Sequence, residues 1–238
     1  MLVCAQWGRT SVLRQSAPAE TSVGAIDGAF LGLLGLLLAF AFAASASRFD
    51  ERRKIAVDEA NAISSAVLKF DLLPEPERTA AKTTMRDYID ARLEYGKKLS
   101  SGMAPEMEWR RTKDLQNALW RPLRVVIGKK PHAPIAIVLM PALCQVYDLA
   151  ATRHLLTKTH APFPVVGLIV ALSLISAFIA GRAMATIRMH TVVYRNLYSL
   201  AIVRTVLVIL DLDHPRLGLI RVDYTDLALL EIKADLSH

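Results

Sequence analysis

The histidines and cysteines, the side chains in this sequence best suited to catalysis or metal binding, do not follow the spacing of a known site. None of the six histidines belongs to an HExxH pair or another metal-ligand pattern, and Cys4 and Cys144 lie far apart without CxxC spacing. The sequence also contains no GxSxG nucleophile elbow, P-loop or Rossmann fingerprint. We therefore predict no catalytic residues, no metal site, no cofactor and no enzyme activity.

Other polar residues are interpreted as structural. Asp58 and Glu59 are neighbours in a segment rich in charged residues, so we expect both carboxylates to be solvated. His154 and His160 are expected to face solvent or to lie at helix ends. Neither pair is predicted to form a functional site.

Arg204 lies inside an apolar stretch that covers about residues 192–210. A guanidinium in hydrocarbon is costly, so one interpretation is a functional residue that faces protein or water. The alternative is a shifted span in which the Arg204 side chain extends along the helix to the membrane interface. Asp27, at the start of another apolar stretch, is a conceivable partner, but the sequence does not show that the two meet.

Small residues recur along the first apolar stretch at steps of three and four. They are Gly28, Gly32, Gly35 and Ala39, followed by Ala43 and Ala46. This spacing places them on one helical face, which lets helices approach closely where lipid supplies no hydrophobic driving force. The stripe fits ordinary helix packing, and it also fits packing of identical helices around a symmetric pore.

Three apolar blocks are long enough to hold these residues inside a bilayer. Hydrophobic residues make up 53% of the chain and the mean hydropathy is +0.32, while charged residues still make up 21%, so the apolar residues are concentrated in blocks. The predicted spans are 24–46, 163–183 and 192–210, since about 20 helical residues cross a hydrocarbon core of about 30 Å. A further block at 134–143 is short and contains Pro141, which we expect to interrupt it. We therefore place 134–150 outside the bilayer.

Long amphipathic helices are predicted between the first and second spans. They cover 47–70, 77–99 and 105–127, and breaks containing proline or glycine separate them. Because 47–161 carries more lysine and arginine than either terminus, we place this domain in the cytoplasm. The formal charge of +7 needs no nucleic acid partner, since the sequence has no basic stripe with interleaved aromatic residues.

The predicted fold class is all-α, a multi-span helical membrane protein with a cytoplasmic helical domain. Its expected parts are an N-terminal segment, a span that continues into the cytoplasmic domain, two further spans and a C-terminal tail. Their ranges are 1–23, 24–46 with 47–161, 162–211 and 212–238.

Several segments resemble the bestrophin family of membrane proteins, and most specifically the bestrophin-like DUF4239 group. The apolar residues 34–40 followed by the charged run 48–53 are similar to the bestrophin junction of a span with its cytoplasmic continuation. Residues 143–164 resemble the cytoplasmic helix and proline-containing turn before the third bestrophin span. The segment 210–230 is similar to the bestrophin-like group itself. The likeness extends over about residues 22–232.

This resemblance implies a largely helical four-span subunit that assembles with copies of itself, as a pentamer in bestrophins. It also implies that the helix at 24–46 lines a central pathway for inorganic ions, with a hydrophobic constriction. The matching position is Phe40, with Leu36 and Leu33 facing the same way on earlier turns. The expected surroundings are membrane lipid, in a bacterial inner membrane.

The chain departs from the bestrophin pattern in three places. Of the family's Trp-Trp pair, only Phe49 stands at the first aromatic position. Only residues 2–7 match the first bestrophin span, so that span is either lost or truncated. Gly218 is followed by Leu-Ile-Arg instead of the acidic calcium clasp of animal bestrophins, so we do not expect calcium gating. Two functions stay open at this point: a subunit of an ion channel, or a non-conducting membrane scaffold that binds a partner through its helical domain.

Overall fold

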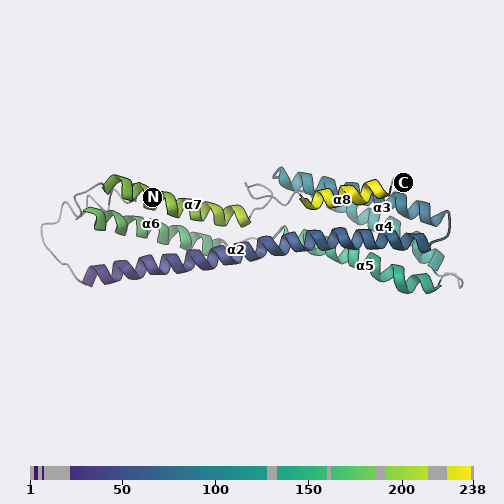
Figure 1. Cartoon of the computed structure of the whole chain (residues 1–238), viewed down its shortest axis with the longest axis horizontal. Helices are drawn as coiled ribbons and strands as arrows, with labels where there is room; N and C mark the ends of the chain where they lie inside the picture. The colour runs from purple at the N-terminus through teal and green to yellow at the C-terminus, as the bar shows by residue number, and fades with distance from the viewer. Residues whose placement is uncertain are drawn as a thin grey trace. The chain divides into compact units, whose positions relative to one another are not determined.

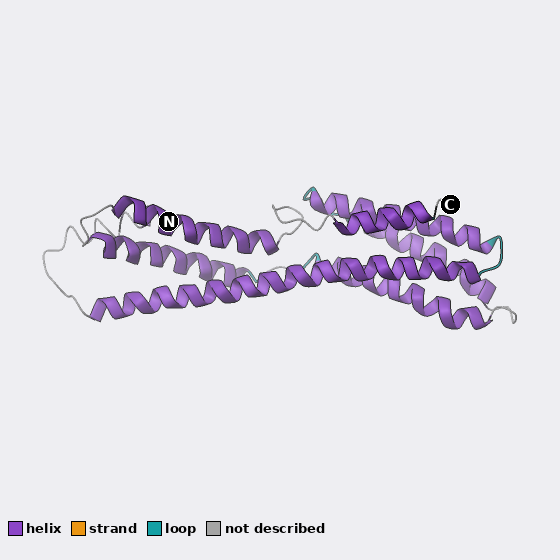
Figure 2. Ribbon diagram, viewed as in Figure 1, coloured by secondary structure: helices purple, strands orange, loops and turns teal. Residues whose placement is uncertain are grey.

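The computed structural model describes residues 3, 4, 7, 22–127, 133–159, 162–185, 191–213 and 224–236. Within these residues it is helical and contains no strand, which confirms the predicted fold class (Figures 1 and 2). The elements are α2 (Ser22–Lys69), the 3-10 turn η1 (Phe70–Leu72), α3 (Glu77–Ser100), α4 (Glu106–Ile127), α5 (Ala133–Leu156), α6 (Phe163–Ala185), α7 (Thr191–Asp213) and α8 (Tyr224–Asp235).

The chain divides into two compact units, and helix α2 contributes to both. The first unit contains Met1–Arg48 and His160–Asp213, and the second contains Phe49–Thr159 and His214–His238. As predicted, α2 is continuous from the apolar block into the charged segment, because nothing in its 48 residues breaks a helix. It ends where Pro74 and Pro76 restrict the residues before them.

The first unit is a small apolar bundle of α2, α6 and α7. Its core consists of Leu34 and Leu38 from α2, Ile169 and Leu172 from α6, and Ile209 from α7. Many other apolar side chains of these helices point outward, which suits a bilayer and not water. By length and composition, all three helices are able to cross a membrane.

The second unit is built from the charged part of α2 together with α3, α4, α5 and α8. One core joins these helices, and its fully buried members include Ile63, Phe70, Met85, Ile89, Leu139, Leu143 and Val146. Its outer surface carries charged pairs such as Lys82 with Asp71, whose Nζ and Oδ1 lie 2.8 Å apart. A soluble-type core with a charged exterior is what the amphipathic pattern predicts.

Helix α5 corrects one prediction. The helix runs without interruption through Pro141, whose side chain is exposed, so the expected break at this residue is wrong. By length and composition α5 becomes a fourth helix able to cross a membrane. It nevertheless buries Leu139, Leu143 and Val146 in the core of the second unit, next to the charged helices α3 and α4. The placement of 134–150 outside the bilayer stays a prediction.

Candidate functional site

The pore residues expected from the resemblance lie on an outward face of α2. Leu33, Leu36 and Phe40 are 46%, 52% and 62% exposed in the single chain. Leu34 and Leu38 are buried against α6 and α7. At about 100° per residue, the outward set is turned from the buried pair by about 150°, so the two sets lie on nearly opposite sides of the helix. Neither α6 nor α7 therefore covers the three predicted pore residues.

The small residues of α2 lie on a third face of the helix. A Cβ added to Gly28, Gly32 or Gly35 would meet no heavy atom within 4 Å, and Ala39 is exposed. These positions therefore pack against nothing in the described part of their own chain. Of the two interpretations of the stripe, packing within the subunit receives no support from these contacts.

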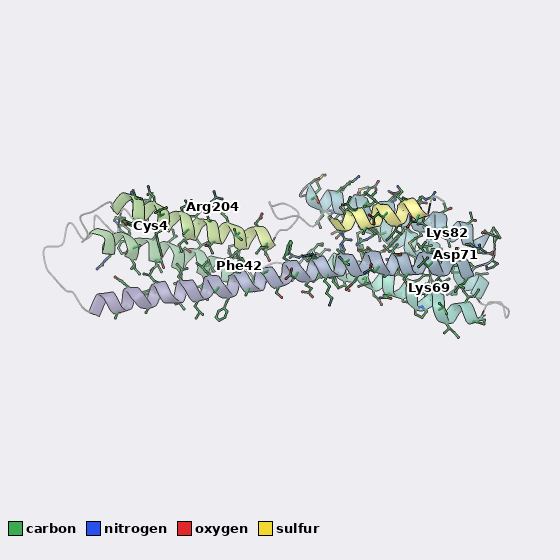
Figure 3. All side chains as sticks on the ribbon, in the orientation of Figure 1. Cys4, Phe42, Lys69, Asp71, Lys82 and Arg204 are labelled. Atoms are coloured by element: carbon green, nitrogen blue, oxygen red, sulfur yellow. The ribbon has the colours of Figure 1, made fainter. Side chains whose placement is uncertain are left out.

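Arg204 points outward from α7 and does not meet its suggested partner (Figure 3). Its neighbours on the same helical face, Leu200 and Leu207, are exposed apolar side chains. Asp27 is half-buried on α2, and the described residues include no ion pair or hydrogen bond between Asp27 and Arg204. The role of Arg204 stays a prediction.

Two segments that carry the bestrophin resemblance meet at one end of the apolar unit. Arg48 of α2 donates from Nε to Oδ1 of Asp213 in α7 at 2.8 Å, and from Nη2 to Oγ of Ser45 at 2.9 Å. A cavity of about 170 Å³ lies beside this pair, with otherwise apolar walls from α2, α6 and α7.

Within the second unit, Arg52 of the same charged run donates to the Leu156 carbonyl at 3.2 Å, at the carboxyl end of α5.

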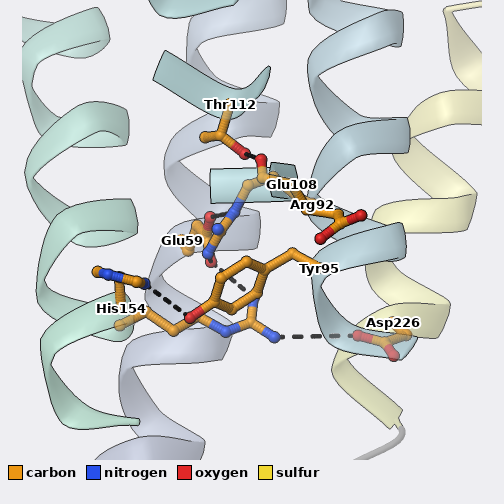
Figure 4. Close-up of polar contacts among 8 residues, drawn as sticks. Glu59, Arg92, Tyr95, Glu108, Thr112, His154 and Asp226 are labelled. Carbon is orange, nitrogen blue, oxygen red and sulfur yellow. Dashed lines mark hydrogen bonds and ion pairs between the residues drawn. The ribbon is translucent and has the colours of Figure 1, made fainter. Parts of the chain in front are cut away.

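The second unit contains a buried charge network that sequence reasoning missed (Figure 4). Glu59 of α2 and Arg92 of α3 are fully buried. Arg92 donates to both Glu59 oxygens, at 2.6 and 3.1 Å, and Arg153 of α5 donates to Oε2 at 2.6 Å. Arg153 also lies 3.9 Å from Asp226 of α8. The network thus joins four helices, and the expectation of a solvated Glu59 is wrong.

The arginines keep this buried carboxylate ionised. Burial alone would raise the pKa of Glu59, but the charges of Arg92 and Arg153 and the hydrogen bonds from both outweigh it and lower that pKa to about 2. Burial likewise favours neutral Arg92, yet Glu59 raises the pKa of that guanidinium. Glu59 and Arg92 are therefore both charged at neutral pH.

An aromatic cluster adjoins the network and holds His154, which was predicted to face solvent or a helix end. His154 is buried near the end of α5, its ring stacks on Trp109 with centroids 4.2 Å apart, and its Nδ1 lies 2.9 Å from the Tyr95 hydroxyl. The Arg92 guanidinium lies over the Tyr95 ring at 4.8 Å. Burial, followed by the charge of Lys158, lowers the pKa of His154, so the imidazole is neutral at pH 7.

Helical phase is the signal that could have placed Glu59 in the interior. Ala56, Ala60 and Ile63 lie three residues before, one after and four after it, and all are buried. The adjacent Asp58 lies on a different side of the helix and is only half-buried. Adjacent acidic residues in a helix point to different sides, so the burial of Asp58 and of Glu59 must be predicted separately.

Comparison with known proteins identifies the family. A sequence model of the bestrophin-like domain matches residues 4–227. A bacterial bestrophin homologue from Klebsiella pneumoniae carrying a point mutation aligns with a TM-score of 0.77 and 14% identity, over 100% of this chain and 96% of that chain. A second mutant of that homologue gives a TM-score of 0.75 and 12% identity, over 99% of this chain and 97% of the other. A search of curated proteins finds no match.

At these identities the solved structures establish the fold alone. The family assignment rests on the sequence match, which covers nearly the whole chain. The chain belongs to the bestrophin-like family.

Proposed function

We propose that this membrane protein is a subunit of a homo-oligomeric ion channel with a hydrophobic neck. The observation that carries the proposal is the outward face of α2 formed by Leu33, Leu36 and Phe40. Copies of this face around a symmetry axis would form stacked apolar rings one helical turn apart. Such rings impede ions by dewetting, without a charged gate.

The glycine and alanine stripe supports assembly. Gly28, Gly32, Gly35 and Ala39 leave an unfilled face beside the predicted neck, and small residues let neighbouring spans approach closely in lipid. One face of α2 then packs on α6 and α7, a second receives a neighbouring subunit, and a third faces the axis. The bestrophin resemblance favours five copies, in a bacterial inner membrane with the helical domain in the cytoplasm.

Ion flux through liposomes tests the neck. Phe40→Ala widens and wets the narrowest ring, so flux through the reconstituted variant should exceed that of the unchanged protein several-fold. Phe42→Ala is the matched control, because Phe42 is 46% exposed but points to another side of α2. Its flux should equal that of the unchanged protein.

Oligomeric state in mild detergent separates this function from the scaffold alternative. A monomer excludes a central pore on a symmetry axis. Oligomers that conduct no ions, with or without Phe40→Ala, would instead favour a non-conducting scaffold. Equal flux increases in the Phe40 and Phe42 variants would mean that the conducting path does not follow the predicted face.

A further inference from the structure

The cavity beside the Arg48–Asp213 pair lies entirely within the apolar unit. Its volume is about 170 Å³, and all of its lining residues belong to the first unit. The apolar walls include Ala41 of α2, Val166 and Ile169 of α6, and Ile209 of α7. This space is close to that of an engineered cavity of about 150 Å³ that binds benzene, so it can hold about six carbon atoms.

Water is a poor occupant for most of this cavity. A buried water molecule needs about two to four polar partners, and cavities with apolar walls stay dry. The polar side chains of the lining are Ser45, Arg48 and Asp213, and hydrogen bonds join them in one group at the end of the apolar unit. Water has partners only at that end, so the remaining space is suited to hydrocarbon.

The polar end of the cavity offers a hydrogen-bond donor but little net charge. Asp213 neutralises Arg48, since its Oδ1 lies 2.8 Å from the guanidinium Nε. Ser45 is 1% exposed, and its Oγ accepts a hydrogen bond from Nη2 of Arg48 at 2.9 Å. A hydroxyl also has one proton to donate, and the described residues provide no acceptor for that of Ser45. A neutral acceptor such as an ester carbonyl would satisfy this buried donor.

The cavity is partly open, and hydrocarbon can enter it from the bilayer. Among its lining residues Ala44, Val165 and Leu210 are exposed, so they form the rim. The helices that carry them are able to cross a membrane, where lipid takes the place of water as the solvent. Arg48 and Asp213 follow the apolar blocks of α2 and α7, so the polar end of the cavity lies near the boundary between hydrocarbon and lipid headgroups.

We propose that this cavity binds a segment of about six carbons of a lipid acyl chain, with the ester carbonyl beside Ser45 and Arg48. The carbonyl accepts hydrogen bonds from these two side chains, and the apolar walls enclose the chain. A free short-chain amphiphile has the same chemistry, an alkyl chain next to a neutral acceptor. The site is separate from the α2 face that forms the predicted neck, and the inference does not depend on conduction.

Photolabelling of the full-length protein in liposomes tests the site. The probe is phosphatidylcholine with a diazirine at about the sixth carbon of one acyl chain, and mass spectrometry locates the labelled residues. Ile169 and Ile209 are 5% and 7% exposed, so label on them requires a chain inside the cavity. The outward residues Leu168 and Val170 are the internal reference, because bulk lipid should label both. We expect label on all four residues.

Substitutions that fill or close the cavity locate the binding. Ala41→Leu fills the space, and Ala44→Leu narrows the entrance at an exposed position that tolerates a larger side chain. Each should lower the labelling of the two buried isoleucines at least about fivefold relative to the outward reference, without lowering the Tm. Ala171→Leu is the matched control, because Ala171 is an exposed alanine of α6 outside the lining, and it should change nothing. Unchanged labelling of the isoleucines in both cavity variants would refute the assignment.

A second probe, hexanol carrying a diazirine, separates the two sources of the alkyl chain. Label on Ile169 and Ile209 from the lipid probe assigns the cavity to a bilayer lipid, whereas label from the hexanol probe alone assigns it to a free amphiphile. Because Asp213 already neutralises Arg48, a phosphatidylglycerol probe should label as strongly as phosphatidylcholine. Label from the anionic lipid alone would mean that headgroup charge is recognised, which contradicts the proposal. If neither isoleucine is labelled by any probe, the proposal is overturned and protein side chains close the cavity.

Discussion

Replacing Glu59 by Gln should destabilise the second unit strongly. The substitution keeps the shape of the side chain but removes its charge, so buried Arg92 loses its counter-ion and Arg153 is left with Asp226, 3.9 Å away. Removing one partner of a buried ion pair typically costs about 3–5 kcal/mol. For a protein of this size each kcal/mol lowers the Tm by about 2–4 °C, so the expected decrease is about 6–20 °C.

Intrinsic fluorescence is a suitable assay, because Trp109 and Trp120 both lie on α4 in this unit. The Trp109 ring stacks on His154, next to the network. The control is Asp58→Asn, which removes a neighbouring acid that forms no ion pair among the described residues and should change the Tm by less than about 2 °C. If Glu59→Gln unfolds within 2 °C of the unchanged protein, the network does not stabilise the unit as argued.

The stabilisation should also depend on pH in a defined direction. The pKa of Glu59 is lowered to about 2 in the folded protein, whereas an unfolded glutamate titrates near 4.3. The contribution is therefore complete above about pH 5 and is lost as the pH falls through the folded value. The Tm difference between the unchanged protein and Glu59→Gln should be constant from pH 6 to 8 and should shrink below about pH 4. A difference that grows on acidification would contradict this assignment.

Three further predictions concern the apolar unit and α5. Gly35→Leu should prevent assembly without unfolding the subunit, because a Cβ there would meet no heavy atom within 4 Å in the described part of the chain. Gly167→Leu, equally open on α6, should leave the oligomer intact in size-exclusion chromatography. Arg204→Leu should change the oligomer fraction or the anion-to-cation permeability ratio; if both stay unchanged, Arg204 only reaches the membrane interface. In a Cys4→Ser background, the exposed thiol of Cys144 should react with a membrane-impermeant maleimide in opened vesicles, and full protection would place α5 in the bilayer.

Local rules account for most of the fold. Apolar length and small-residue spacing identify α6, α7 and the first half of α2, since a chain in lipid must satisfy its backbone hydrogen bonds within the helix. Pro74 and Pro76 predict a helix end, and α2 with η1 ends at Leu72, just before them. The error at Pro141 shows the limit of the same rule, because an exposed proline removes one backbone hydrogen bond and a helix held by tertiary packing tolerates the loss.

The buried network could not be predicted from the sequence in full. Helical phase could have placed Glu59 in the interior, but its partners lie 33 and 94 residues away, on α3 and α5. No local pattern specifies which of the many arginines in this basic domain meet one glutamate. A buried, ionised Glu59 is unfavourable unless positively charged groups lie beside it. The packing of the second unit determines that these groups are Arg92 and Arg153.

The contact of Arg48 with Asp213 gives a physical reason for part of the bestrophin resemblance. The two residues lie 165 positions apart, in two of the segments that resemble bestrophins, and they meet where α2 and α7 leave the apolar unit. Asp213 is almost completely buried at the end of an apolar helix, where an ionised carboxylate without a partner would be unfavourable. A guanidinium at the matching level of α2 provides that partner and fixes which ends of the two spans lie together. Two charges that lie far apart in the chain thus stabilise each other where the spans meet.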